Sequence, residues 1–220
     1  MRWIYATALV AAAGLVTLGA EEPMPSADAV LAELKAGNAH HVAKTYQRPH
    51  QTEARQRVLA SGQSPHCAIL ACADSRVPPE IIFDQGLGDI FDVRVAGNVA
   101  DDDETASLEY AAEHLHVPLV VVMGHTHCGA VTAAMEGGTA PGKLPHLLAA
   151  IQPAVEQSAH QQGDRLDNAV RANVVNVVAQ LRAAKPVLAE LVAEGKLRIV
   201  GAVYSIDTGR VEWLPDAGVR

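Results

Sequence analysis

Two short runs of uninterrupted apolar residues, 67–72 and 119–123, constrain the fold of this 220-residue chain more than any other feature. Each run has the length of a β-strand and is followed by polar or turn-forming residues. Strands that are apolar on both faces are typical of a parallel sheet covered by helices on each side, because neither face meets water. The sequence therefore predicts an α/β fold.

Helical and strand patterns alternate along the rest of the chain, which supports this fold class. Further strands are expected at 90–95, 197–206 and 210–214, and Asp207-Thr208-Gly209 is expected to form a hairpin turn between the last two. Helices are expected at 26–45, 53–61, 101–114, 129–136, 144–157, 166–181 and 187–193. Gly37-Asn38 is expected to interrupt or end the first helix.

The predicted architecture is a mostly parallel sheet of about four strands with an added antiparallel strand at its C-terminal end. Helices are expected to flank this sheet on both faces. No repeat, low-complexity tract or composition shift divides the chain after its first twenty residues. We therefore expect residues 21–220 to form a single domain.

Residues 1–20 have the pattern of a secretory signal peptide. Arg2 precedes an uncharged stretch, 3–20, which ends in the small residues Gly19-Ala20. An uncleaved membrane anchor is the alternative, since about eighteen apolar residues can just span a bilayer. The stretch is rich in small residues and no basic cluster follows it, so cleavage is favoured. We expect an exported, periplasmic protein with no stable membrane insertion once the leader is removed.

Charge and composition exclude several classes of function. The chain carries 17 basic and 25 acidic side chains, a net charge of −8, and lacks the basic balance of a general nucleic-acid binder. Its few aromatic side chains offer little stacking surface for single strands. Three cysteines are too few, and the wrong parity, for a disulfide framework. No nucleic-acid partner is expected.

Two polar clusters directly follow the two apolar runs and bring metal-ligating residues together. One contains Cys72, and the other contains His125 and Cys128. Ligands of open α/β sheets bind beyond the carboxyl ends of the strands, so both clusters are expected to face one crevice. Two thiolates and one imidazole are a donor set that favours Zn²⁺.

The number of ligands bears on whether such a site is catalytic. Structural zinc sites have four protein ligands, whereas catalytic sites have three and leave a position for water. Cys67 is expected on the opposite face of its strand from Cys72. His127 and Asp74 both remain open as a fourth ligand, with Asp74 the stronger candidate. The open, three-ligand site is favoured.

The sequence resembles the β-class carbonic anhydrases, and this likeness extends over nearly all of the chain after the leader. The motifs that carry it are Cys72-Ala73-Asp74-Ser75-Arg76-Val77-Pro78, Phe83-Asp84-Gln85-Gly86-Leu87-Gly88-Asp89, Val93-Arg94-Val95-Ala96-Gly97-Asn98, Ser107-Leu108-Glu109-Tyr110, Gly124-His125-Thr126-His127-Cys128-Gly129 and Thr208-Gly209-Arg210-Val211. Together these motifs are highly specific. The resemblance implies one zinc ion per subunit and a homodimer or homotetramer.

The resemblance also implies roles for individual residues. It assigns Cys72, His125 and Cys128 as the zinc ligands. It assigns Asp74 and Arg76 as a catalytic dyad, with the aspartate accepting the proton of zinc-bound hydroxide as that hydroxide attacks CO2. Two further positions match residues that contact the substrate in the family, and these are Gln85 and Tyr110.

The expected reaction is the reversible hydration of CO2 to bicarbonate and a proton, which makes the protein a carbonate dehydratase, a zinc lyase. The family has an always-open form and a form regulated by bicarbonate. Ile69 stands where the regulated form has tryptophan, so the open form is expected, although Arg94 matches a position used by the regulated one. Two alternatives remain. The same scaffold could hydrolyse a CO2 analogue such as CS2 or COS, or the chain could be a non-catalytic zinc- or redox-sensing protein.

Overall fold

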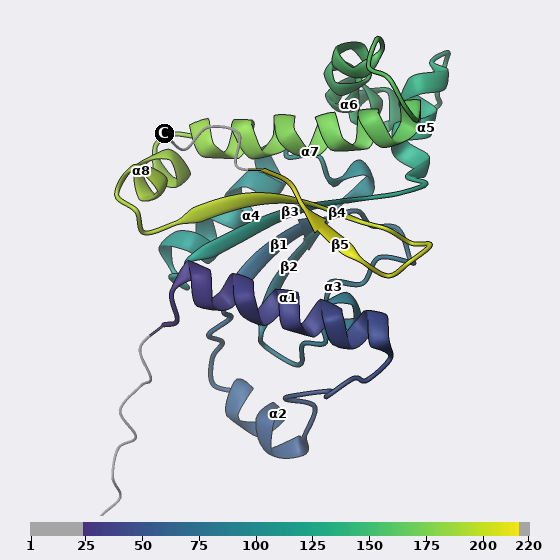
Figure 1. Cartoon of the computed structure of the whole chain (residues 1–220). Helices are drawn as coiled ribbons and strands as arrows, with labels where there is room; N and C mark the ends of the chain where they lie inside the picture. The colour runs from purple at the N-terminus through teal and green to yellow at the C-terminus, as the bar shows by residue number, and fades with distance from the viewer. Residues whose placement is uncertain (1–23, 216–220) are drawn as a thin grey trace, which may run out of the picture.

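A computed structural model describes residues 24–215, so the predicted leader at 1–20 lies outside the described residues. Five strands form one sheet in the order β2-β1-β3-β4-β5 (Figure 1). The strands are β1 (Cys67–Ala71), β2 (Ile90–Arg94), β3 (Leu119–His125), β4 (Arg198–Tyr204) and β5 (Val211–Trp213). The first four pair in parallel, and β5 pairs antiparallel with β4. The predicted mostly parallel α/β sheet with an antiparallel C-terminal strand is confirmed.

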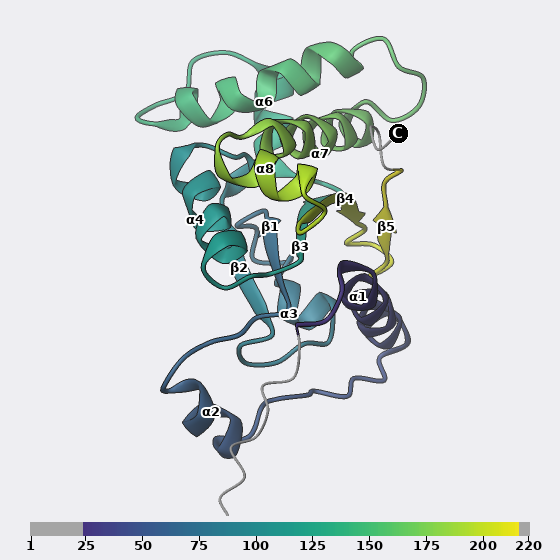
Figure 2. The same cartoon turned by 90° about the vertical axis from the view of Figure 1, so that its left-hand side faces the viewer.

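The helices cover both faces of this sheet, which explains why its central strands are apolar throughout. On one face lie α1 and the single-turn α3, and on the other lie α4, α7 and α8, with α5 and α6 beyond (Figures 1 and 2). The short α2 stands away from the sheet and has no buried residue. The helices are α1 (Ala27–Ala43), α2 (Glu53–Leu59), α3 (Pro79–Ile82), α4 (Asp102–Glu113), α5 (Gly129–Glu136), α6 (Leu144–Ser158), α7 (Arg165–Ala183) and α8 (Val187–Ala193).

Side chains of β1 alternate between two separate apolar clusters, one on each face of the sheet. Leu70 and Cys72 pack on the side of α7, whereas Cys67 and Ile69 pack on the side of α1. The expectation that Cys67 and Cys72 face opposite ways is therefore confirmed. Cys67 is 1% exposed, and burial raises the pKa of its thiol, so it is an inert core residue.

The expected break of the first helix at Gly37-Asn38 is wrong, because α1 continues through both residues to Ala43. A Cβ at Gly37 would lie 1.7 Å from the carbonyl oxygen of Phe83, so the glycine lets the helix approach that loop. The Asn38 side chain donates to the carbonyls of Ile82 and Gly209 and accepts from the amide of Val211. Both residues serve tertiary contacts rather than a helix end.

Two other boundaries differ from the sequence pattern. Two consecutive prolines commonly end regular structure, but α3 begins at Pro79, since proline is tolerated in the first turn of a helix. β3 was expected to end before Gly124, but it runs on to His125, which pairs with Tyr204 of β4. Helix ends follow local signals more closely: Asp101 and Glu104 form a capping box that starts α4.

Candidate metal centre

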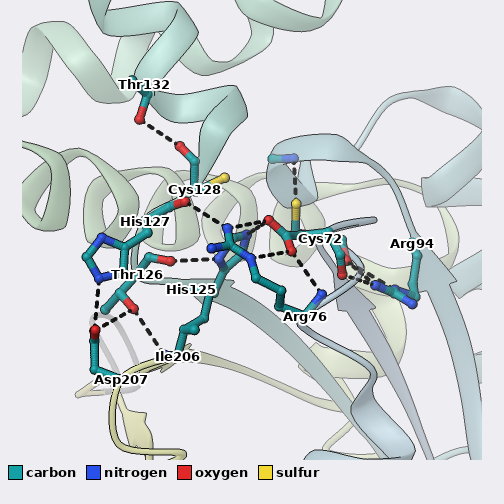
Figure 3. A network of polar contacts seen from close by, with 12 residues as sticks. Cys72, Arg76, Arg94, His125, Thr126, His127, Cys128, Thr132, Ile206 and Asp207 are labelled. Carbon is teal, nitrogen blue, oxygen red and sulfur yellow. Dashed lines mark hydrogen bonds and ion pairs between the residues drawn. The ribbon is translucent and has the colours of Figure 1, made fainter.

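The carboxyl ends of β1 and β3 bring the three predicted ligands together. Cys72 directly follows β1, His125 is the last residue of β3, and Cys128 precedes α5. Their Sγ and imidazole nitrogen atoms all lie within 4.8 Å of one another, and all three residues are buried. Figure 3 shows these side chains converging from the two strand ends. The arrangement follows from topology, because parallel neighbours end at the same edge of a sheet.

The imidazole of His125 is oriented for a metal ion. Its Nδ1 lies 2.8 Å from the carbonyl oxygen of Thr126 and donates to it, which leaves Nε2 with a free lone pair. His125 is 0% exposed, and its Nε2 has no hydrogen-bond partner among the residues that the structure describes. A buried polar atom without a partner is costly, so this nitrogen is expected to bind a ligand atom or ion. Two thiols and this imidazole nitrogen fit the donor set of zinc.

The two thiols of the cluster lie close together, and each shifts the pKa of the other. Cys72 Sγ accepts a hydrogen bond from the amide of Gly97, whose nitrogen is 3.3 Å away. The adjoining Cys128 thiol, with smaller contributions from neighbouring donors, lowers the pKa of Cys72. The adjoining Cys72 sulfur raises the pKa of Cys128. The cluster thus holds one thiolate readily, and a cation would stabilise the second.

Asp74 and Arg76 form a bidentate ion pair beside the cluster. Arg76 Nε is 2.9 Å from Asp74 Oδ1, and Nη2 is 2.8 Å from Oδ2. The Arg76 amide also donates to Oδ1 at 2.9 Å. These hydrogen bonds, the guanidinium ones first, hold the pKa of Asp74 well below its usual range.

The Asp74 carboxylate faces the metal-ligand cluster. Its Oδ2 lies 3.9 Å from the free Nε2 of His125. Both carboxylate oxygens are already engaged by Arg76, an orientation that suits a hydrogen-bonding dyad better than a fourth metal ligand. The structure therefore brings together five of the predicted site residues, namely Cys72, Asp74, Arg76, His125 and Cys128.

His127, the other candidate fourth ligand, points away from the cluster. Its Nε2 lies 2.9 Å from Oδ2 of Asp207, and the side chain is 58% exposed (Figure 3). The backbone of His127 has a left-handed φ of 57°, and its carbonyl accepts from Arg76. In this turn His127 therefore contributes its main chain to the site, and its imidazole lies toward solvent.

Gln85 and Tyr110 have their partners elsewhere in the described chain. The side-chain amide of Gln85 donates to the carbonyl of Phe83 at 3.1 Å. Gln85 also lines a cavity of about 470 Å³, together with Tyr46 and Glu80. The Tyr110 ring packs against Phe91 and is 47% exposed. Within one chain neither residue is joined to the metal-ligand cluster, so their assignment to the substrate stays a prediction.

Two supporting contacts were not anticipated from the sequence. Arg94 donates to the main-chain carbonyls of Cys72 and Asp74. Thr126 bridges to the β4–β5 turn, because its amide donates to Tyr204 and its hydroxyl accepts from the amide of Ile206. A charged residue at the end of a strand, next to a ligand-bearing strand, is the signal that could have indicated Arg94.

Comparisons with known proteins agree with this geometry. A family model described as carbonic anhydrase matches residues 67–211. Carbonic anhydrase 2 of Mycobacterium tuberculosis is 44% identical over 193 residues, covering 85% of this chain and 93% of the relative. The carbonic anhydrase of Mycolicibacterium smegmatis is 40% identical over 195 residues, covering 86% and 95%.

Solved structures show the same likeness. A tetrameric β-carbonic anhydrase of Sordaria macrospora superposes with a TM-score of 0.67 at 28% identity, covering 85% of this chain and 97% of that one. The Coccomyxa β-carbonic anhydrase in complex with acetazolamide gives 0.65 at 27% identity, covering 85% and 82%. The fold and the Cys-His-Cys cluster define an α/β protein with a site that could bind zinc. The chain belongs to the β-class carbonic anhydrase family, as its sequence motifs predicted.

Proposed function

We propose that this chain catalyses the reversible hydration of CO2 to bicarbonate and a proton. The observation that carries the proposal is the ion-paired Asp74 carboxylate 3.9 Å from the free Nε2 of His125, at the edge of the metal-ligand cluster. Cys72, His125 and Cys128 would hold one zinc ion per subunit. Zinc held there would activate water as a nucleophile near neutral pH, since zinc makes a water molecule more acidic.

The remaining steps belong to side chains of this chain. Asp74 stays ionised because Arg76 lowers its pKa, so its carboxylate can accept a hydrogen bond from the nucleophile. Arg76 donates to both oxygens of Asp74 and so fixes the orientation of the carboxylate. This orientation determines the direction in which the carboxylate can accept a hydrogen bond from the nucleophile. Arg76 also reaches the His127 carbonyl, so the dyad is tied to the turn that carries His125 and Cys128. Such positioning lowers the entropic cost of reaching the transition state.

A stopped-flow assay of CO2 hydration on zinc-loaded protein tests this function directly. Wild-type protein is expected to accelerate hydration far above the buffer rate, and Asp74→Ala is expected to lose most of that acceleration while retaining zinc. Cys128→Ser is expected to lose both zinc and activity. A zinc-loaded wild type that matches the uncatalysed rate would overturn the proposal and favour a zinc- or redox-sensing protein.

Substrate choice is tested with linear analogues of CO2. The same cluster and dyad are suited to CS2 or COS, whose central carbon is also attacked by a nucleophile. We propose CO2 as the substrate because the sequence motifs resemble those of β-class carbonic anhydrases, and the two mycobacterial relatives described above are carbonic anhydrases. Parallel assays of CO2 hydration and CS2 hydrolysis would reverse this choice if only the second were catalysed.

We further propose that the protein is a homodimer or homotetramer. The Sordaria relatives are described as tetrameric, and large apolar side chains such as Ile81 and Leu87 are exposed on this chain. Gln85 and Tyr110 would contact substrate across such an interface, since neither meets the cluster within its own chain. Sedimentation equilibrium on the zinc-loaded protein tests this, and a monomer at micromolar concentration would contradict it.

Export to the periplasm is proposed from residues 1–20 alone. Among the described residues, no helix is long and apolar enough to cross a membrane. N-terminal sequencing of the protein recovered from cell fractions tests the proposal. A periplasmic protein that begins at or near residue 21 is expected, and a membrane-bound protein that retains Met1 would indicate an anchor instead.

A further inference from the structure

The short segment 72–74 carries two residues with different tasks and belongs to no strand or helix. Cys72 supplies a sulfur to the metal-ligand cluster, and Asp74 supplies the dyad carboxylate. β1 ends at Ala71, so regular pairing with β2 no longer holds this segment. Two main-chain hydrogen bonds remain: the Ala73 amide donates to the carbonyl of Val95 at 3.2 Å, and the Val77 amide donates to the carbonyl of Asp74 at 3.0 Å. Neither of these two bonds involves the carbonyl of Cys72, which flanks Ala73 on one side as the carbonyl of Asp74 does on the other.

The side chain of Arg94 donates hydrogen bonds to both of these carbonyls. Its Nε and Nη2 lie 3.0 and 2.9 Å from the carbonyl oxygen of Cys72, and Nη2 lies 2.6 Å from that of Asp74. Figure 3 shows the guanidinium at the side of the segment opposite to Arg76. A guanidinium presents several donors in one rigid plane, so it can fix two carbonyls relative to each other. Hydrogen bonds from a charged donor are about twice as strong as neutral ones.

We propose that Arg94 is a positioning residue for the reaction: it fixes the main chain of 72–74 so that the Cys72 sulfur and the Asp74 carboxylate keep one relative placement. The inference rests on the proposed function but assigns a role to a different residue. Arg94 lies at the end of β2, an edge strand of the sheet, and reaches the neighbouring strand end with its side chain. The guanidinium thereby continues the β1–β2 contact beyond the point where the pairing stops.

The placement of this segment affects catalysis through distance. Misplacing a reacting group by about 1 Å can lower a rate by about 100-fold. Removing a group that orients metal ligands commonly lowers metal affinity or activity by about 10- to 100-fold. Arg94 does not contact the reacting atoms itself. It acts indirectly, because it donates hydrogen bonds to the main-chain oxygens of Cys72 and Asp74.

A regulatory role is the competing interpretation of Arg94. The resemblance matches this position to one used in the bicarbonate-regulated form of the family, where a tryptophan also takes part. Here the tryptophan position is Ile69, which is 0% exposed, and the Arg94 donors are engaged by carbonyl oxygens. Positioning therefore predicts a change in turnover and zinc retention, whereas regulation predicts a change in bicarbonate dependence alone.

The test uses full-length, zinc-loaded Arg94→Met, which keeps most of the side-chain stem and removes the donors. Arg182→Met is the matched control. Arg182 also donates to a main-chain carbonyl through its guanidinium, but this carbonyl is that of Ile199 in β4, which is not part of the segment 72–74. We expect Arg94→Met to lower kcat/KM about 10- to 100-fold and to accelerate zinc release to a chelator by a similar factor. Arg182→Met is expected to change both by less than about 3-fold.

Cobalt substitution gives a readout that does not depend on turnover. The visible absorption of Co²⁺ in the cluster reports ligand geometry, and we expect it to shift in Arg94→Met but not in Arg182→Met. If Arg94→Met fails to fold, Arg94→Lys carries the same test, since a single ammonium cannot reproduce the planar fork. For Arg94→Lys we expect about a 5- to 10-fold loss of kcat/KM, faster zinc release and a shifted cobalt spectrum.

Two results would overturn the inference. The first is wild-type kcat/KM, zinc release and cobalt spectrum in the Arg94 variants. The second is an altered bicarbonate or pH dependence with those three quantities unchanged, which would assign Arg94 to regulation. Failure of the proposed function is distinguishable, because wild-type protein would then hydrate no CO2 while zinc release and the cobalt spectrum would still report on Arg94.

Discussion

The guanidinium of Arg76 meets the carboxylate of Asp74 edge to edge, with Nε 2.9 Å from Oδ1 and Nη2 2.8 Å from Oδ2. The two residues are only two apart in the sequence, and the Arg76 amide closes a local turn onto the same carboxylate. This pairing keeps Asp74 ionised and aimed at the cluster. Its geometry leads to predictions that separate catalysis from metal binding.

Replacing Asp74 by Asn is expected to lower kcat for CO2 hydration by about 100-fold or more, because an amide of the same shape cannot accept the nucleophile's proton as a carboxylate does. Stopped-flow kinetics measures the loss, and metal analysis serves as the control, since zinc content should stay near one per chain. Unchanged kcat in Asp74→Asn would remove Asp74 from the mechanism.

Replacing Arg76 by Lys tests the geometry of the pair rather than its charge. A lysine cannot make two parallel hydrogen bonds to one carboxylate, so kcat is expected to fall about 10-fold despite the retained charge. The measurement is kcat at saturating CO2 for wild type and variant under identical buffer conditions. If Arg76→Lys turned over like wild type, charge alone would explain the dyad.

The depressed pKa of Asp74 predicts a sign for the pH dependence of stability. In the unfolded chain an aspartate titrates near about 3.9, and a group with a lower pKa when folded stabilises the fold above that pH. The stabilisation by Asp74 should be fully present above about pH 5 and should decline as the pH falls below about 4. Urea unfolding of wild type and Asp74→Asn, both zinc-loaded, measures the difference in free energy of unfolding. A difference that grows toward low pH would contradict the prediction.

The three cysteines are expected to differ in their effect on zinc. Cys72→Ala and Cys128→Ala should lose most of the bound metal, because each removes one of the three residues of the proposed metal site. Cys67→Ala is the matched control: Cys67 is buried on the opposite face of β1 and should retain about one zinc per chain at a modest cost in stability. Metal analysis of the purified variants decides this, and zinc loss in Cys67→Ala alone would refute the assignment.

Gly37→Ala should destabilise the protein although it lies in a helix. Alanine favours helix formation by about 1 kcal/mol over glycine, but a Cβ at Gly37 would lie 1.7 Å from the Phe83 carbonyl oxygen. Overpacking of this kind is expected to cost about 1–3 kcal/mol. Gly62→Ala, where an added Cβ meets nothing within 4 Å, should change the free energy of unfolding by less than about 1 kcal/mol. Thermal and urea unfolding compare the two variants with wild type. A free energy of unfolding for Gly37→Ala equal to that of Gly62→Ala would show that α1 can shift away from Phe83 without cost.

The sequence by itself determined the central parallel strands, the helix start at Asp101 and the edge of the sheet at which the ligands meet. Each of these depends on a local pattern: an apolar run of strand length, an acidic capping residue, or metal-ligating side chains directly after a strand. Such patterns act between residues close in the chain, so they can be recognised without knowing where distant segments lie.

Only the tertiary structure decided that α1 runs through Gly37-Asn38, and that Arg94 holds the carbonyls of Cys72 and Asp74. It also decided that the His127 imidazole turns to Asp207 instead of the cluster. These contacts join residues that lie 20 to 173 positions apart in the chain. Their formation depends on the order and spacing of strands in the sheet, because a buried carbonyl or side chain takes whichever partner that packing brings within hydrogen-bonding distance.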